Sequence, residues 1–148
     1  NVGDVVFNYA EGPNNGAPLI LLHAQLLDWF TYSKVLPELS KNFHAEHRGN
    51  CAMSVAYGYA RATGKSEAEA VEAAEMFRTF GGGKAPNGVC GALYAAKMMQ
   101  PDHADAIEDF FRRGAQNFTK CAEIRPNKVI PCNRCVELAG EALDFLNQ

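Results

Sequence analysis

The sequence contains no apolar run that approaches the roughly 18 residues needed for a membrane-spanning helix. Its longest apolar stretch, residues 19–27, is interrupted by His23 and Gln25. The chain also lacks an excess of one charge: 14 basic and 17 acidic residues give a net charge of −3, and the basic residues are scattered. These absences argue against a membrane protein and against a nucleic-acid-binding surface.

The first residues lack the basic and apolar regions of an export signal, so we expect a cytoplasmic location. In a reducing compartment, five cysteines favour reactive or metal-binding roles over a disulfide framework. A length of 148 residues with 47% hydrophobic content predicts one globular domain, with room for a short extension.

The first 44 residues differ from the rest. Residues 4–10 and 18–23 are typical of strands, residues 12–16 form a dense turn signal, and residues 29–42 are helical in pattern. The segment resembles the start of an α/β-hydrolase, in the residues Leu21-Leu22-His23-Ala24, Trp29, Tyr32 and Leu36-Pro37-Glu38-Leu39.

The nucleophile elbow of such a hydrolase, Gly-x-Ser-x-Gly, is missing. The nearest pentapeptide is centred on Ser54, and no strand precedes it. A hydrolase remnant is therefore the least favoured function. Open strand edges in residues 1–44 would suit a homo-oligomer.

Residues 45–148 have helical patterns throughout. Helices are expected over residues 49–63, 66–80, 87–99, 101–118, 121–124 and after Pro131, the second opening on the capping box Ser66-Glu-Ala-Glu69. We therefore predict a mainly α protein: a small helical bundle (45–148) with an N-terminal strand–turn–strand–helix extension (1–44).

The five cysteines carry the chemical information, and four of them, Cys51, Cys90, Cys132 and Cys135, lie at or near predicted helix starts. A helix start offers unpaired N–H groups and positive partial charge, which favour the thiolate. The glycines of residues 81–83 are expected to let the backbone pass close to Cys90. The alternative is that each buried cysteine is simply a small apolar residue.

The pair Cys132-Asn-Arg-Cys135 has the spacing of a two-thiolate metal clip or of a disulfide that opens and closes. On a helix both thiols would face the protein body. His44 and His47 have a spacing that permits metal binding or proton transfer, although a solvated linker explains them as well.

Together these residues resemble the C_GCAxxG_C_C family of small redox-active proteins. The matching segments are Gly49-Asn50-Cys51-Ala52, Phe80 to Gly83, Gly88-Val89-Cys90-Gly91-Ala92, Cys121 and Cys132. Ala95 replaces the glycine that ends the second motif, and Cys135 is an extra thiol. The resemblance implies a helical fold and a redox role, and a related module is thought to hold an iron–sulfur cluster.

Three functions follow from these cysteines. The first is electron transfer or redox sensing by an iron–sulfur cluster on Cys51, Cys90, Cys121 and Cys132, with Cys135 as an alternative ligand. The second is thiol–disulfide exchange, in which Cys132 attacks and Cys135 resolves. The third is a structural zinc module. The expected partner is a redox protein or a small thiol.

Overall fold

A computed structural model describes residues 35–46, 48–127 and 129–146. The strand–turn–strand predicted in residues 1–34 lies outside this range. The described residues are mainly helical, as predicted. The α-helices are α1 (Val35–Ala45), α2 (Cys51–Ala62), α3 (Glu67–Glu75), α4 (Gly91–Met99), α5 (Ala104–Gly114), α6 (Cys121–Ile124) and α7 (Cys132–Leu146). Among these helices, none is long and apolar enough to cross a membrane.

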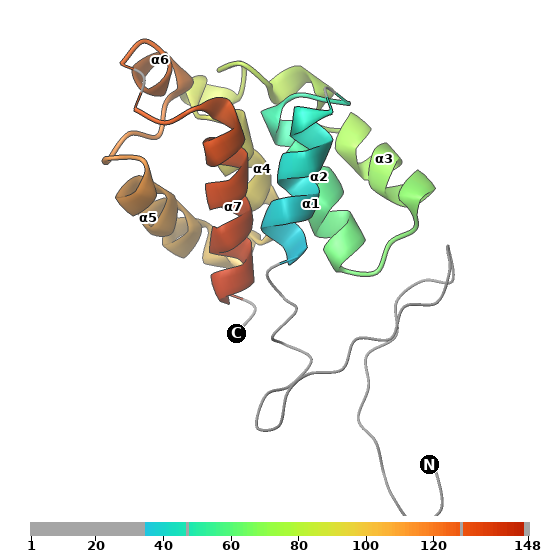
Figure 1. The fold of residues 1–148 in the computed structure, drawn as a ribbon. Coiled ribbons are helices and arrows are strands. Elements are labelled where there is room, and N and C mark those ends of the chain that lie inside the picture. Colours follow the sequence, from blue (N-terminus) through green and yellow to red (C-terminus); the bar gives the residue numbers. More distant parts are fainter. Residues whose placement is uncertain (1–34, 47, 128, 147–148) are drawn as a thin grey trace, which may run out of the picture.

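Helix α1 packs against α2 and α7 and belongs to the helical body (Figure 1). The boundary proposed after residue 44 thus falls one residue before the end of α1. Small residues allow this contact. A Cβ atom on Gly58 of α2 would lie 1.9 Å from the Ser40 hydroxyl, and one on Gly140 of α7 would lie 2.9 Å from Leu36.

Helix α3 begins at the predicted capping box. The Ser66 hydroxyl accepts a hydrogen bond from the Glu69 backbone N–H, and the Glu69 carboxylate accepts one from the Ser66 N–H. The helix ends earlier than predicted, at Glu75, and a short 3₁₀ turn over Arg78–Phe80 leads into the loop Gly81–Gly83, which we call the glycine loop.

Two further predicted helix bounds are wrong, and in both cases left-handed backbone is the reason. Helix α4 begins at Gly91 and not at residue 87, because Asn87 and Gly88 have φ of 57° and 73°. Helix α5 ends at Gly114 and not at residue 118, because Gln116 and Asn117 have φ of 51° and 68°. Neither conformation continues a right-handed helix.

The core lies where α2, α4, α5 and α7 meet. Its largest fully buried side chains are Phe111, Leu36, Leu93, Ile107, Ile124, Leu143, Val55 and Val136. Burying an aliphatic or aromatic side chain of this size contributes about 1.5–3 kcal/mol, so this core is the main source of stability.

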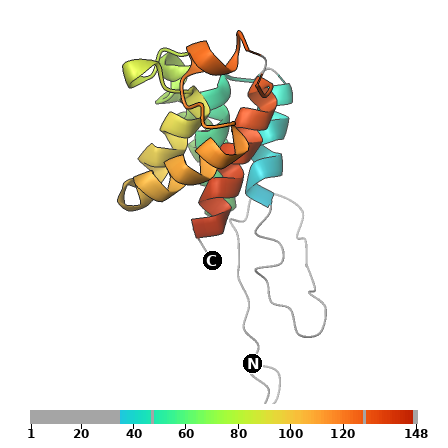
Figure 2. The same ribbon diagram turned by 90° about the vertical axis from the view of Figure 1, so that its left-hand side faces the viewer.

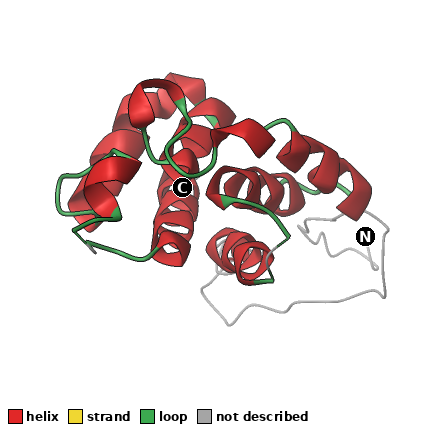
Figure 3. Ribbon diagram, turned by 90° about the horizontal axis from the view of Figure 1, so that it is seen from above, coloured by secondary structure: helices red, strands yellow, loops and turns green. Residues whose placement is uncertain are grey.

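One end of the bundle collects several helix starts. In Figures 1 and 2, α6 and the beginning of α7 lie at the end opposite the C-terminus. Viewed from that end, the described elements are helices joined by loops (Figure 3). This end carries the cysteines.

The contact between α1 and α2 leads to a stability prediction. Replacing Gly58 with Ala should lower the free energy of unfolding by about 1–3 kcal/mol, because the added methyl group overlaps Ser40 and its backbone N. Urea denaturation measures the change. Ser40→Ala is the control: the Ser40 hydroxyl is buried and forms no hydrogen bond within the described residues, so its removal should cost little. Equal stabilities of wild type and Gly58→Ala would contradict the close packing.

Candidate thiol site

Four cysteines of the described residues stand at the starts of four different helices. Cys51, Cys121 and Cys132 are the first residues of α2, α6 and α7, and Cys90 is the N-cap of α4. The prediction that Cys51, Cys90 and Cys132 lie at or near helix starts is thereby confirmed. Cys135 lies one turn into α7, and its backbone N–H donates to the Pro131 carbonyl.

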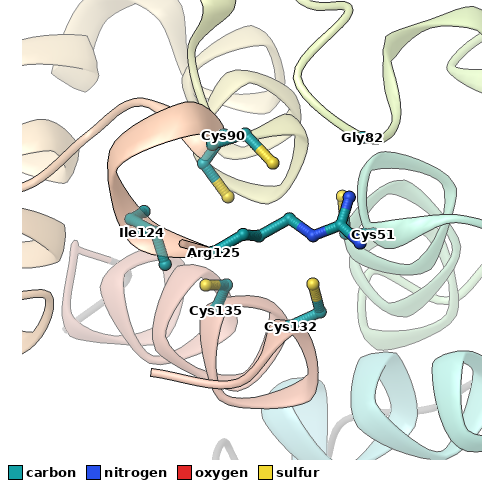
Figure 4. A pocket seen from close by; sticks show the side chains of 8 residues that line it. Cys51, Gly82, Cys90, Ile124, Arg125, Cys132 and Cys135 are labelled. Atoms are coloured by element: carbon teal, nitrogen blue, oxygen red, sulfur yellow. The ribbon is translucent and has the colours of Figure 1, made fainter. Parts of the chain in front are cut away.

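All five cysteines line a single cavity of about 30 Å³. Figure 4 shows the labelled thiols directed toward this space from opposite sides, with the Arg125 side chain extended between them. The remaining lining residues are Gly82 and Ile124. Helix starts that are distant in the sequence therefore place their sulfur atoms together.

Three of the thiols lie next to one another in a row. Cys51 interacts with Cys90, and Cys90 interacts with Cys135. The contact with Cys90, together with burial, raises the pKa of Cys51 far above its usual range. The contact with Cys135, together with burial, raises the pKa of Cys90 to about 12. Cys51 and Cys90 are therefore protonated at neutral pH, because adjacent buried thiolates would repel each other.

The backbone N–H groups at the helix starts do lower the pKa of the cysteines, as expected, but other interactions raise it by more. Backbone N–H groups of Gly82 and Ala92 donate to the Cys51 sulfur, and the N–H of Leu93 donates to Cys90, and each of these bonds lowers a pKa. The thiol contacts and desolvation outweigh them. The prediction that helix starts give thiolates is therefore wrong for Cys51 and Cys90.

Cys132 differs from the other cysteines because it is exposed. Partial burial raises its pKa, the positive charge of Arg125 lowers it, and Cys51 and Cys121 interact with it electrostatically. Cys135, three residues later, is only 2% exposed. The C-x-x-C pair thus consists of an accessible thiol and an inaccessible one.

The glycine loop fits closely around the site. A Cβ atom on Gly83 would lie 3.0 Å from the Cβ of Cys121, and one on Gly91 would lie 2.9 Å from the Cys51 sulfur. Gly83 also has a φ of 85°, which favours glycine. The loop was expected near Cys90, but the contacts of Gly82 and Gly83 are with Cys51 and Cys121.

Asn50 connects the start of α2 to this loop. Its side-chain oxygen accepts hydrogen bonds from the N–H groups of Ala52 and Met53, and its side-chain nitrogen donates to the Arg78 carbonyl at 2.8 Å. One residue therefore caps the helix that carries Cys51 and holds the segment that leads into the glycine loop.

Arg125 and Ile124 were not identified from the sequence. A signal was available, because Arg125 follows Cys121 by four residues and this spacing places two side chains on the same side of a helical turn. The Arg125 N–H donates to the Cys121 carbonyl at 3.1 Å, as this turn requires. The other candidates do not join the site: Ser54 is fully buried in α2, and His44 lies in α1. His23 and His47 are outside the described residues.

The thiols do not fit a metal cluster in this arrangement. Their chemistry suits a soft metal or an iron–sulfur cluster. However, a cavity of about 30 Å³ has room for only about two water molecules. Within the described residues, no group of three or more His, Cys, Asp or Glu side chains is positioned to hold a metal ion. A cluster on the predicted ligands would require the thiols to separate and lose their protons.

Comparisons with the models of known protein families, with curated proteins and with solved structures found no match for this chain. The fold and the site themselves define the class of protein: a helical protein with five clustered cysteines.

The arrangement predicts an order of thiol reactivity. In the native protein, iodoacetamide should modify Cys132 first, because the other four thiols are buried. The midpoint of its rate against pH should lie above about pH 8.5, the pKa of a free cysteine, because burial raises the pKa of the Cys132 thiol. Mass spectrometry of the alkylated peptides gives both results. The unfolded protein in urea is the control, since all five thiols should then react alike. A rate that levels off below pH 8 would show that Cys132 is instead a stabilised thiolate.

Proposed function

We propose that the protein is a thiol–disulfide oxidoreductase whose redox centre is the cluster of five cysteines. One observation carries the proposal: five cysteines from four separate helices line one small cavity, with an exposed thiol and a buried thiol adjacent on α7.

The exposures of the C-x-x-C pair support distinct roles. The Cys132 thiolate attacks one sulfur of a disulfide substrate, forms a mixed disulfide and releases the first thiol. Cys135 then loses its proton and attacks the Cys132 sulfur, which forms the Cys132–Cys135 disulfide and releases the second thiol. Two protein thiols are oxidised and one substrate disulfide is reduced to two thiols. Arg125 favours the first step, because its positive charge stabilises the Cys132 thiolate.

Cys90 can transfer the disulfide from the Cys132–Cys135 pair to the protein interior. Its interaction with Cys135 places it next to a sulfur of the disulfide that the outer pair forms. After losing its proton, Cys90 can attack Cys135, which creates a Cys90–Cys135 disulfide and frees Cys132. The exposed thiol is then restored while the disulfide is stored in the protein interior.

An iron–sulfur cluster that transfers electrons is the second candidate. It is favoured by the four cysteines at four helix starts and by the backbone N–H groups that donate to the Cys51 sulfur. Such hydrogen bonds tune the potential of a cluster. In the present arrangement the thiols would first have to move apart, so we place this function second.

The two functions predict different proteins after purification without oxygen. A thiol–disulfide enzyme should be colourless and iron-free, and mild oxidation should remove two of its five titratable thiols. Cys135→Ser should lose disulfide turnover by at least about tenfold, because the mixed disulfide can no longer be resolved by its neighbour. Ala106→Ser is the matched control, since Ala106 is exposed on α5 and does not line the cavity, and its turnover should persist.

An iron–sulfur cluster or a zinc module would each give a different set of results. Visible absorption bands that bleach with dithionite, together with bound iron and sulfide that persist in Cys135→Ser, would replace the thiol enzyme with the cluster. A colourless protein with stoichiometric zinc and no disulfide turnover would instead establish a structural zinc module.

A further inference from the structure

A second, larger hollow adjoins the thiol cavity. It has a volume of about 510 Å³ and shares three of its lining residues with the cavity: Gly82, Cys121 and Arg125. Its other lining residues are Gly83, Gly88, Ala122 and Pro126. We call it the glycine groove. Pockets of 300–1,000 Å³ are the usual size for small organic ligands, whereas the thiol cavity is too small for one.

The surface of the glycine groove is unusually free of side chains. Four of its residues are glycine or alanine, and a Cβ atom on Gly82 or Gly88 would meet nothing within 4 Å. A ligand can therefore approach this backbone closely. The Gly82 N–H faces the Cys51 sulfur and the Gly88 N–H donates to the Ala85 carbonyl at 3.0 Å, so the backbone offers a ligand mainly its carbonyl groups. Backbone N–H and C=O groups recognise amide-containing ligands through hydrogen bonds.

Arg125 is the charged residue of the groove, and its charge is available to a ligand. Arg48, Arg78, Arg112 and Arg134 all form ion pairs with glutamates. Arg125, in contrast, forms no ion pair with a carboxylate of the described residues, and no residue that lines the groove is acidic. A guanidinium binds a carboxylate through two parallel hydrogen bonds.

These observations converge on one kind of ligand. We propose that the glycine groove binds a low-molecular-weight thiol or disulfide that carries a carboxylate and amide groups. Arg125 receives the carboxylate, the glycine loop faces the amide groups, and the ligand sulfur lies at the boundary formed by Cys121 and Arg125, beside Cys132. This inference rests on the proposed thiol–disulfide function and names the substrate class of that site.

Reactivity toward two disulfides tests the substrate class. Glutathione disulfide carries carboxylates and amides, whereas bis(2-hydroxyethyl) disulfide carries neither. The reduced wild-type protein should react faster with glutathione disulfide. Arg125→Gln should lower the ratio of the two rates by about threefold to tenfold, the range for a partly exposed contact with a charged group. Arg113→Gln is the matched control, because Arg113 is exposed and does not line the groove.

The ratio separates binding from thiol chemistry. Arg125 also acts on the Cys132 thiol, so its removal slows both disulfides, but only a lost carboxylate contact changes their ratio. A second variant blocks the space: Ala122→Trp places a large side chain in the groove and should abolish the preference. Its control is Ala106→Trp, at an exposed position of α5.

A binding measurement without redox chemistry completes the test. S-methylglutathione has the same carboxylates and amides but no reactive sulfur, and it should shift the backbone NMR signals of Gly82, Gly83 and Gly88. If neither disulfide reacts but these signals shift, ligand binding in the glycine groove is confirmed and the proposed thiol–disulfide function is wrong. If both disulfides react, the ratio of their rates is unchanged in Arg125→Gln and Ala122→Trp, and no NMR signal shifts, the thiol–disulfide function is supported. The glycine groove is then not its substrate site.

Discussion

Cys90 touches the thiols of two other helices, and the chemistry of the site depends on that contact. Neighbouring buried sulfur atoms cannot all carry negative charge, because their repulsion is poorly screened away from water. They can share protons, form a disulfide or bind a cation. The three positions of the row belong to α2, α4 and α7, so whichever state the sulfurs adopt also determines how closely these helix starts approach.

The rest of the fold brings those helix starts together. Gly58 and Gly140 allow α1 to lie close to both α2 and α7, which aligns the first turns of the latter two at one end of the bundle. Asn50 and the glycine loop then close the site from the side of α2. Ordinary close packing and one capping side chain thus position the sulfurs, and the thiol cluster is built on rigid helices, where geometry is held best.

Local features of the sequence predicted local features of the structure. The Ser66 capping box, the bounds of the short helix at Cys121 and the start of α7 after Pro131 were all correct, because each depends on neighbouring residues. The left-handed residues at 87 and 116 were missed, since asparagine and glutamine adopt that conformation only where the surrounding structure imposes it. The raised pKa values and the position of Arg125 depend on contacts between distant segments. The spacing of the cysteines along the sequence therefore indicated which of them belong to the candidate site, but not which sulfur atoms lie next to each other.

Helix α6 is a single turn of four residues, and two of its side chains, Cys121 and Ile124, are buried against the bundle. The preceding residues are joined to the start of α4 by a β-bridge between Val89 and Lys120 and by the Cys90 N–H, which donates to the Thr119 carbonyl at 2.7 Å. Short segments with few such bonds open at a smaller free energy than the helices of a packed core. Because this turn carries both Cys121 and Arg125, its opening would expose the inner sulfurs while the bundle stayed folded. Hydrogen exchange at α6 would report such a local opening separately from global unfolding.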